Sequence, residues 1–215
     1  MAMFPAFIDI KGKKCVVVGG GKVATRKIET LLKFEPRIVV VSPEISERIQ
    51  ALKWEDKVVV IKKKYSSEDL EGACLVIAAT DHSSVNDRVF QDAQKSGILV
   101  NIADDPDKCT FIFPSVIMRD DLVVGISTSG SFPALSKMIR ERVEQVLPEF
   151  YEGIVGVLKD CRERALREIE DVEIRQKLMN RLLDEVLFYE DAIPFEHLMQ
   201  RIDCLFEEYK NEKNH

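Results

Sequence analysis

The chain has 215 residues, 46% of them apolar, which is enough for one substantial hydrophobic core and a smaller second one. The net charge of −6 lies entirely in residues 151–215, which hold 16 of the 37 acidic and 10 of the 31 basic side chains. No basic stripe dominates and no apolar run approaches the ~20 residues of a membrane span, so we expect neither a nucleic-acid partner nor a membrane segment.

The five cysteines are scattered, at positions 15, 74, 109, 161 and 204, and form no C-x-x-C pair. An odd, irregular set indicates reduced thiols and neither disulfides nor a zinc site. The first residues also lack the charged start and long apolar core of a secretory signal. We therefore expect a cytoplasmic protein without a resident metal.

The strongest single motif lies between Cys15 and Lys27. Residues Cys15–Val18 suit a buried parallel strand, three glycines follow at once, and Lys22–Phe34 has the apolar spacing of a helix. The order Gly19-x-Gly21-x-x-Ala24 fits the dinucleotide-binding fingerprint, with alanine in the permitted third place. Glycines let the chain turn and let its backbone approach a pyrophosphate, which the free N–H groups of the helix then bind. We predict nucleotide contacts at Gly19, Gly20, Gly21, Lys22 and Val23.

Strands and helices alternate further along the chain. We expect a helical turn at Ser67–Leu70, a helix from Glu44 to about Leu52, a helix from near Ser83, and strands at Arg37–Val41, Val58–Ile61, Leu75–Ala79 and Ile98–Ile102. Five alternations without a hairpin signal predict an α/β fold with a doubly wound parallel sheet of the Rossmann type. Right-handed crossovers put the carboxyl ends of all strands on one edge, where the glycines, Thr80 and Asn101–Asp104 should meet.

The second strand ends in Ser42-Pro43-Glu44, where the NAD fingerprint expects an acid that holds the ribose hydroxyls. Ser42 can still bond to a ribose, but the missing acid leaves the choice between NAD and NADP open. After the fourth strand, Thr80 and Asp81 can contact the cofactor or cap the next helix, and His82 is interpreted as a solvated loop residue.

Acidic residues follow the fifth strand, in Asn101-Ile-Ala-Asp104-Asp105-Pro-Asp. A carboxylate at the edge of a crevice can accept or donate a proton during catalysis. The same letters are also ordinary turn chemistry, and spacing alone does not separate the two interpretations.

Taken together, the ordered motifs resemble the precorrin-2 dehydrogenase (siroheme synthase N-terminal) family over residues 4 to about 147. The matching pieces are Phe4-Pro5, Gly19-Gly-Gly-Lys-Val-Ala-x-Arg-Lys27, Ala78-Ala-Thr-Asp81 with Val85-Asn86, Asn101-x-x-Asp104, Phe111-x-x-Pro114-Ser115, and Ser127-Thr-Ser-Gly130 with Pro133-x-Leu135. Family members that are fused to a methyltransferase are much longer, so the chain resembles the stand-alone form.

The resemblance implies NAD-dependent oxidation of precorrin-2 to sirohydrochlorin, with Asp104 at the position of the family's key aspartate. A carboxylate there would accept the proton that leaves with the hydride. The further predicted cofactor contacts follow the ends of the strands and are Ser42, Pro43, Thr80, Asp81 and Asn101. Some relatives insert Fe²⁺ into the product as well, and the sequence leaves this open.

Residues 114–147 are expected to hold strands at Pro114–Arg119 and Leu122–Ser127 and a helix at Pro133–Leu147. In the resembled family this region pairs two subunits, so we predict a homodimer; an ordinary extension of the core is the alternative. Precorrin-2 carries eight carboxylates, for which the predicted binding residues are Ser127, Thr128, Ser129, Arg119, Lys137 and Arg140, with Lys22 a further cation to consider.

The last part of the chain is predicted to form helices at Glu149–Ile169, Val172–Tyr189 and Pro194–Lys210. The expected domains are therefore 1–113 for NAD, 114–147 for dimerisation and 148–215 as a helical domain. Two other functions remain open at this point. A non-catalytic nucleotide sensor would keep the glycines but has no need of Asp104, and a chelatase would need no cofactor.

Overall fold

The computed structural model of the protein describes residues 3–147, 151–188 and 195–211. The chain forms two compact units: Met1–Phe113 with Ser127–Phe132, and Pro114–Ile126 with Pro133–His215. The division at residues 113 and 147 into a cofactor domain, a dimerisation region and a helical domain stays a prediction.

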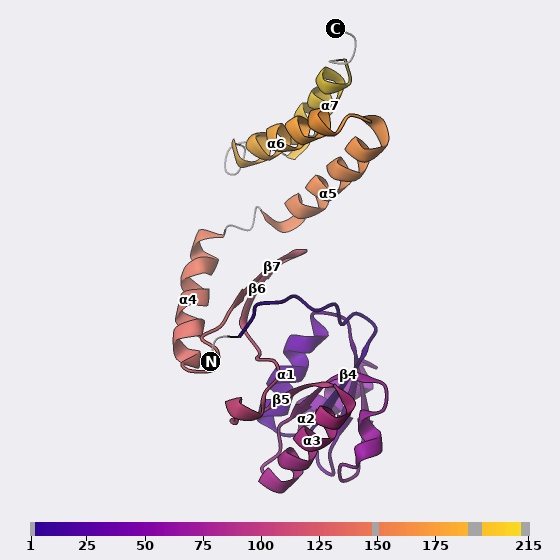
Figure 1. The fold of residues 1–215 in the computed structure, drawn as a ribbon, viewed down its shortest axis with the longest axis vertical. Helices are drawn as coiled ribbons and strands as arrows, with labels where there is room; N and C mark the ends of the chain where they lie inside the picture. The colour runs from indigo at the N-terminus through magenta and orange to yellow at the C-terminus, as the bar shows by residue number, and fades with distance from the viewer. Residues whose placement is uncertain (1–2, 148–150, 189–194, 212–215) are drawn as a thin grey trace. The chain divides into compact units, whose positions relative to one another are not determined.

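The first unit contains one sheet of five parallel strands in the order β3-β2-β1-β4-β5 (Figure 1). The strands are β1 (Lys14–Val18), β2 (Arg37–Val41), β3 (Val58–Ile61), β4 (Ala73–Ala78) and β5 (Leu99–Ile102). This order reverses between β1 and β4, and ligands bind open α/β sheets outside the carboxyl ends of the strands at such a point. The predicted Rossmann-type fold is confirmed.

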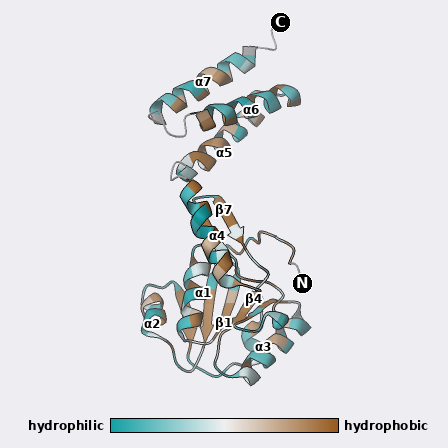
Figure 2. Cartoon of the chain, turned by 90° about the vertical axis from the view of Figure 1, so that its left-hand side faces the viewer, coloured by the Kyte–Doolittle hydropathy of each residue, from teal (hydrophilic) through white to brown (hydrophobic). Residues whose placement is uncertain are grey.

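Helices cover both faces of this sheet, which explains why its strands are apolar throughout. Helices α1 (Lys22–Leu32) and α2 (Glu47–Trp54) pack on one face, with Ala24, Ile28 and Ile49 among the buried residues. The other face is covered by α3 (Ser83–Ser96) and the short 3₁₀ helix η1 (Ser67–Leu70), through Val89, Ala93 and Leu70. In Figure 2 the strands between these helices are brown, because β-branched side chains dominate both faces.

One predicted helix start is wrong. The helix expected from Glu44 begins at Glu47, after Ser46, whose Oγ accepts a hydrogen bond from the Ile49 N–H at 3.3 Å. Before it, the Ser42 hydroxyl donates to the Glu44 carbonyl at 2.6 Å and holds Ser42–Glu44 in a turn. A serine cap therefore decides where α2 begins. The other predicted ends of the first unit's elements differ by two residues or fewer.

The described residues of the second unit form a hairpin and four helices. Strands β6 (Ser115–Arg119) and β7 (Leu122–Ile126) are antiparallel, and α4 (Pro133–Val146) packs against both. Helices α5 (Tyr151–Glu168), α6 (Val172–Phe188) and α7 (Phe195–Asn211) share an apolar core. Near its start, α5 has a kink at Gly153, whose backbone angles are not helical. The predicted ends at Glu149, Tyr189 and Pro194 lie outside the described residues.

Among the helices of the described residues, none is both long and apolar enough to span a bilayer.

Candidate nucleotide and substrate site

A cavity of about 1230 Å³ lies at the carboxyl ends of β1, β2 and β4 in the first unit. Nine of the ten residues predicted to bind the cofactor line it: Gly19, Gly20, Gly21, Lys22, Val23, Ser42, Pro43, Thr80 and Asp81. The fold therefore brings together three segments that are up to sixty residues apart in the sequence, as the rule for parallel strand ends requires.

Each glycine of the loop has its own geometric reason. Gly19 has φ +119°, and a Cβ there would collide with the backbone carbonyl of Ala79. A Cβ on Gly20 would collide with the carbonyl of Glu44. Gly21 is exposed, and nothing lies within 4 Å of where its Cβ would be. Two glycines thus permit close packing of the backbone, while the third leaves the first turn of α1 open to a phosphate.

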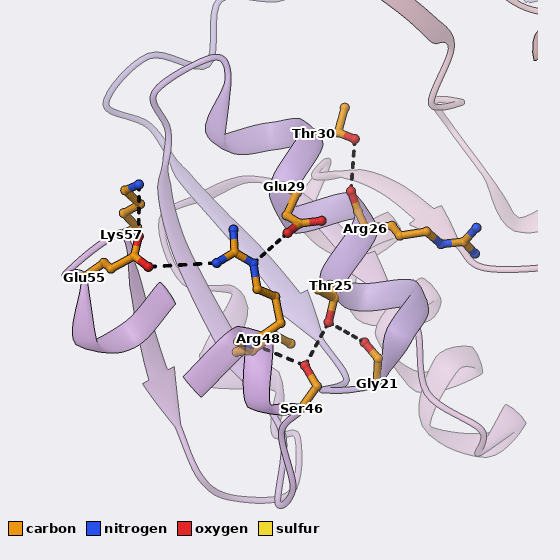
Figure 3. Close-up of polar contacts among 10 residues, drawn as sticks. Gly21, Thr25, Arg26, Glu29, Thr30, Ser46, Arg48, Glu55 and Lys57 are labelled. Atoms are coloured by element: carbon orange, nitrogen blue, oxygen red, sulfur yellow. Dashed lines mark hydrogen bonds and ion pairs between the residues drawn. The ribbon is translucent and has the colours of Figure 1, made fainter. Parts of the chain in front are cut away.

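Hydrogen bonds hold the glycine loop against the start of α2 (Figure 3). The Ser46 N–H donates to the Gly20 carbonyl at 2.8 Å, and the Thr25 hydroxyl donates to the Gly21 carbonyl at 2.9 Å. The hydroxyls of Thr25 and Ser46 lie 3.0 Å apart and bond to each other. Ser46 therefore caps α2 and also fixes the position of the loop that faces the cavity.

The segment after β4 is tied to α3 while it lines the cavity. The Thr80 hydroxyl donates to Oδ1 of the buried Asn86 at 2.8 Å, and Asn86 Nδ2 donates to the Thr80 carbonyl at 3.0 Å. The residue at the N-cap of α3 is His82, whose side chain makes no capping bond, and Asp81 is exposed. Thr80 and Asp81 were predicted to cap the helix or to contact the cofactor; neither is the cap, and both line the cavity.

The lining also includes residues that were not predicted as cofactor contacts, among them Lys64, Tyr65 and Arg88. The Arg88 guanidinium lies 5.9 Å from the centre of the Tyr65 ring, and the Tyr65 hydroxyl donates to Asp92 at 3.0 Å. Burial, followed by this bond to Asp92, raises the pKa of the Tyr65 hydroxyl. Lys64 and Tyr65 follow β3, so the rule that ligands bind at the carboxyl ends of parallel strands applies to them as well.

Asp104 lies in the turn between β5 and the 3₁₀ helix η2 (Pro106–Lys108) and does not line the cavity. It is exposed and has φ +63°, and its carboxylate makes no hydrogen bond or ion pair with any described residue. The turn is braced by Lys108, whose Nζ lies 2.7 Å from Asp87 and 2.9 Å from Asp105. Aspartate tolerates this left-handed conformation because its short polar side chain can bond locally, so the backbone angle by itself does not indicate a function.

Asn101 is the one predicted cofactor contact that lies outside the cavity lining. It is 5% exposed, and its Nδ2 donates to the Phe111 carbonyl at 3.0 Å and to Cys109 Sγ at 3.4 Å. Within the described part of the chain its Oδ1 is buried without a partner. A buried acceptor without a donor is costly, and the role of Asn101 as a cofactor contact stays a prediction.

Ser127, Thr128 and Ser129 belong to the first unit, beside the turn of Asp104. The loop is held by its own side chains, because Thr128 Oγ1 accepts from the Phe132 N–H at 3.1 Å and Ser127 Oγ from the Ser129 N–H at 3.0 Å. A Cβ on Gly130 would lie 3.5 Å from Pro106 in η2. The structure therefore brings the predicted substrate loop next to the predicted catalytic turn.

The other three predicted substrate contacts belong to the second unit, and two are partnered on α4. Lys137 lies 3.8 Å from Glu141, while Arg140 pairs with Glu144 and, at 3.4 Å, with Glu141. Arg119 donates through Nη1 to the Met118 carbonyl at 3.2 Å, and its buried Nε has no partner among the described residues. Their role with a substrate stays a prediction.

Comparisons with known proteins show the family of the chain. Residues 6–115 match the family model for NAD(P)-binding domains, which covers about half of the chain. The solved structure of SirC, precorrin-2 dehydrogenase, is 29% identical, and the two align with a TM-score of 0.79 over 94% of this chain and 100% of the other. The chain belongs to the precorrin-2 dehydrogenase and siroheme synthase N-terminal family. NAD is the cofactor that this family domain binds, as predicted.

Curated relatives of this family are longer than the chain. The siroheme synthase of Thioalkalivibrio sulfidiphilus is 37% identical over 184 residues, which are 86% of this chain and 38% of that protein. The siroheme synthase of Nitrosomonas europaea is also 37% identical over 184 residues, 85% of this chain and 39% of that protein. The chain therefore spans less than two fifths of these siroheme synthases.

Proposed function

We propose that the chain oxidises precorrin-2 to sirohydrochlorin with NAD⁺ as the hydride acceptor. The observation that carries the proposal is the alignment with a precorrin-2 dehydrogenase over that protein's whole length. Two features of the chain support it: the backbone cradle at Gly19–Gly21 and the carboxylate of Asp104 beside the Ser127–Ser129 loop. A nucleotide sensor would need the first of these and not the second.

The cavity residues suit a dinucleotide in the usual orientation of this fold. The N–H groups at the first turn of α1, at Lys22 and Val23, face the phosphates, and Ser42 and Pro43 lie where the ribose hydroxyls bind. Thr80 and Asp81 border the other side of the crevice. Asn101 remains a proposed contact, and its unpartnered Oδ1 supports a donor group in the ligand nearby.

The reaction removes two hydrogens from the macrocycle, one as a hydride and one as a proton. NAD⁺ supplies the hydride acceptor when it is bound. Asp104 is proposed to take the proton, because a carboxylate without a competing partner in the described structure is available as a base. The serine and threonine side chains of the neighbouring loop, together with Arg119, Lys137 and Arg140, are proposed to bind substrate carboxylates.

An anaerobic assay with precorrin-2 and NAD⁺ tests the proposal. NADH absorbance and the spectrum of sirohydrochlorin should rise together in equal amounts. If neither rises while NAD⁺ still binds, the protein is a nucleotide sensor and the proposal is wrong.

Iron insertion is the second candidate activity, because the curated relatives are named siroheme synthases. Fe²⁺ would then be a substrate. The described residues contain no group of three histidine, cysteine or acidic side chains that could coordinate Fe²⁺. Asp104 and the nitrogen atoms of the macrocycle would then have to bind the iron. Adding Fe²⁺ with sirohydrochlorin and no NAD⁺ separates this activity from oxidation, since only a chelatase produces siroheme.

We also propose a cytoplasmic homodimer. Leu135, Met138 and Val146 on α4 are 39%, 39% and 74% exposed, which supports a second copy packing on this helix. The cytoplasmic location rests on five free cysteines. Light scattering after size-exclusion chromatography tests the dimer, and Met138→Glu should reduce the measured mass to that of a monomer.

A further inference from the structure

Lys27 extends the candidate site beyond the cavity. It lies one helical turn after Val23 on α1, and residues four apart share a face of a helix. Val23 lines the cavity, while Lys27 points to the segment after β5. The face of α1 that contacts the nucleotide cavity thus continues to the turn of Asp104.

The ammonium group of Lys27 lies against an aromatic ring and not in open solvent. Its Nζ is 4.2 Å from the centre of the Phe113 ring, and it forms no hydrogen bond or ion pair with any residue that the structure describes. Lysine side chains that serve only as packing usually extend the charged end into water. This one keeps its charge half-buried, where a cation without an anion is unfavourable.

The charged groups around Lys27 offset the cost of burying its charge only in part. Burial lowers the pKa of the Lys27 ammonium; the nearby Cys109 and Asp104 oppose that change, and Arg26 adds to it. Asp104 is close enough to interact but does not form an ion pair with Lys27. An additional anion at this position would therefore stabilise the charged lysine.

A second group without a partner belongs to the same cluster. Asn101 bonds to Cys109 Sγ and to the Phe111 carbonyl, and the Phe111 ring lies 5.5 Å from the Phe113 ring that carries Lys27. The buried Oδ1 of Asn101 lacks a donor within the described structure. A cation, an amide acceptor and two aromatic rings therefore meet beside Asp104, and all of them belong to the first unit.

We propose that Lys27 binds a carboxylate of the tetrapyrrole substrate and thereby places the macrocycle beside Asp104. The inference rests on the proposed function. Precorrin-2 carries eight carboxylates, and an exposed Asp104 repels each of them that approaches. A cation next to Asp104 offsets this repulsion where the macrocycle must come closest. Lys27 is then a binding and positioning residue, and proton transfer remains with Asp104.

Steady-state kinetics and a titration with sirohydrochlorin test the inference. Lys27→Met and Lys27→Gln should each raise the KM for precorrin-2 and the Kd for sirohydrochlorin about tenfold or more, as expected for a lost charge-assisted contact. The value of kcat and the affinity for NAD⁺ should stay close to wild type. Lys27→Arg should restore most of the affinity, since it restores the charge. Lys33→Met, at the exposed end of the same helix, is the matched control and should change nothing.

The outcomes separate the inference from the proposed function. If the wild-type protein does not oxidise precorrin-2, the proposed function fails first. If the wild type does oxidise it and both folded variants keep the wild-type KM and Kd, the inference about Lys27 is wrong. A fall in kcat with a displaced pH profile and an unchanged KM also overturns it, because Lys27 would then act in proton transfer.

Discussion

The backbone of Gly19 lies against the carbonyl of Ala79, with no room for a side chain between them. This contact joins the ends of β1 and β4, the two neighbouring strands between which the order of the sheet reverses. Ala79 in turn donates its N–H to the Val18 carbonyl at 2.8 Å, so the two strand ends support each other. One wall of the nucleotide cavity is therefore made of backbone.

Replacing Gly19 by alanine should disturb the fold itself. The new Cβ would collide with Ala79, and φ +119° is a conformation that alanine rarely adopts. The backbone strain alone is worth about 1–3 kcal/mol. Urea denaturation should therefore show a lower free energy of unfolding, together with weaker NAD⁺ binding. A variant as stable as the wild type would mean that the loop has a different conformation.

Replacing Gly21 by aspartate should leave the fold intact and remove the cofactor. The position is exposed and open, so a side chain fits, but its negative charge would lie where the phosphates bind. We expect NAD⁺ affinity to fall at least tenfold, or about 1.4 kcal/mol, in a calorimetric titration. Gly156→Asp, at another open glycine without a positive φ and in the second unit, is the control for a general effect of charge. Equal affinity of Gly21→Asp and wild type would show that the phosphates bind elsewhere.

Asp104→Asn should separate chemistry from cofactor binding. The amide keeps the shape of the side chain but cannot accept a proton, and removal of a general base slows reactions by about 10²–10⁴-fold. Asp104 does not line the nucleotide cavity, so NAD⁺ binding should persist. Asp107→Asn, at an exposed position of the adjoining η2, should oxidise precorrin-2 at the wild-type rate. Similar rates for both variants would exclude Asp104 as the base.

Much of the first unit could be predicted because its signals are local. Strand β1, the glycines and α1 adjoin one another in the sequence, and the alternation of strands and helices determines the rest of the sheet. The ends of helices were harder to predict from the sequence. Glu44 was expected to start α2, but the helix begins after Ser46, whose capping bond from the Ile49 N–H the sequence does not show. The need for glycine at position 20 was also hidden, since the carbonyl it packs against is that of Glu44, after the next strand.

Only part of the polar cluster beside Asp104 could be predicted from the sequence. The acidic turn and Asn101 follow a strand end, where functional residues collect. Lys27 reads as one more basic residue on an amphipathic helix, because nothing local indicates that Phe113 covers its charge. Such a contact between distant residues depends on side-chain packing, which periodicity does not report.

Acid should weaken the first unit through Asp69, at the start of η1. Its side chain is 6% exposed, and the carboxylate pairs with Lys63 at 2.8 Å and accepts a bond from the Ser66 N–H at 2.9 Å. Burial raises the pKa of Asp69, but the Lys63 and Ser66 contacts outweigh burial and leave the pKa below its ordinary value. A carboxylate with a depressed pKa stabilises the folded state above its unfolded pKa of about 3.9, and this stability is lost as the pH falls through the folded pKa.

The stabilities of wild type and Asp69→Asn should therefore converge in acid. At pH 7 the variant should lose about 1 kcal/mol or more, because asparagine keeps a bond to Ser66 but not the ion pair with Lys63. Denaturation series from pH 7 downward should show this difference begin to shrink at about pH 4, where the unfolded carboxylate takes up its proton, and disappear below the lower pKa of the folded state. Glu68→Gln, an exposed neighbour, should follow the wild type throughout. A difference that stays constant over the whole range would mean that the charge of Asp69 does not stabilise this unit and that the neutral hydrogen bonds around Ser66 are sufficient.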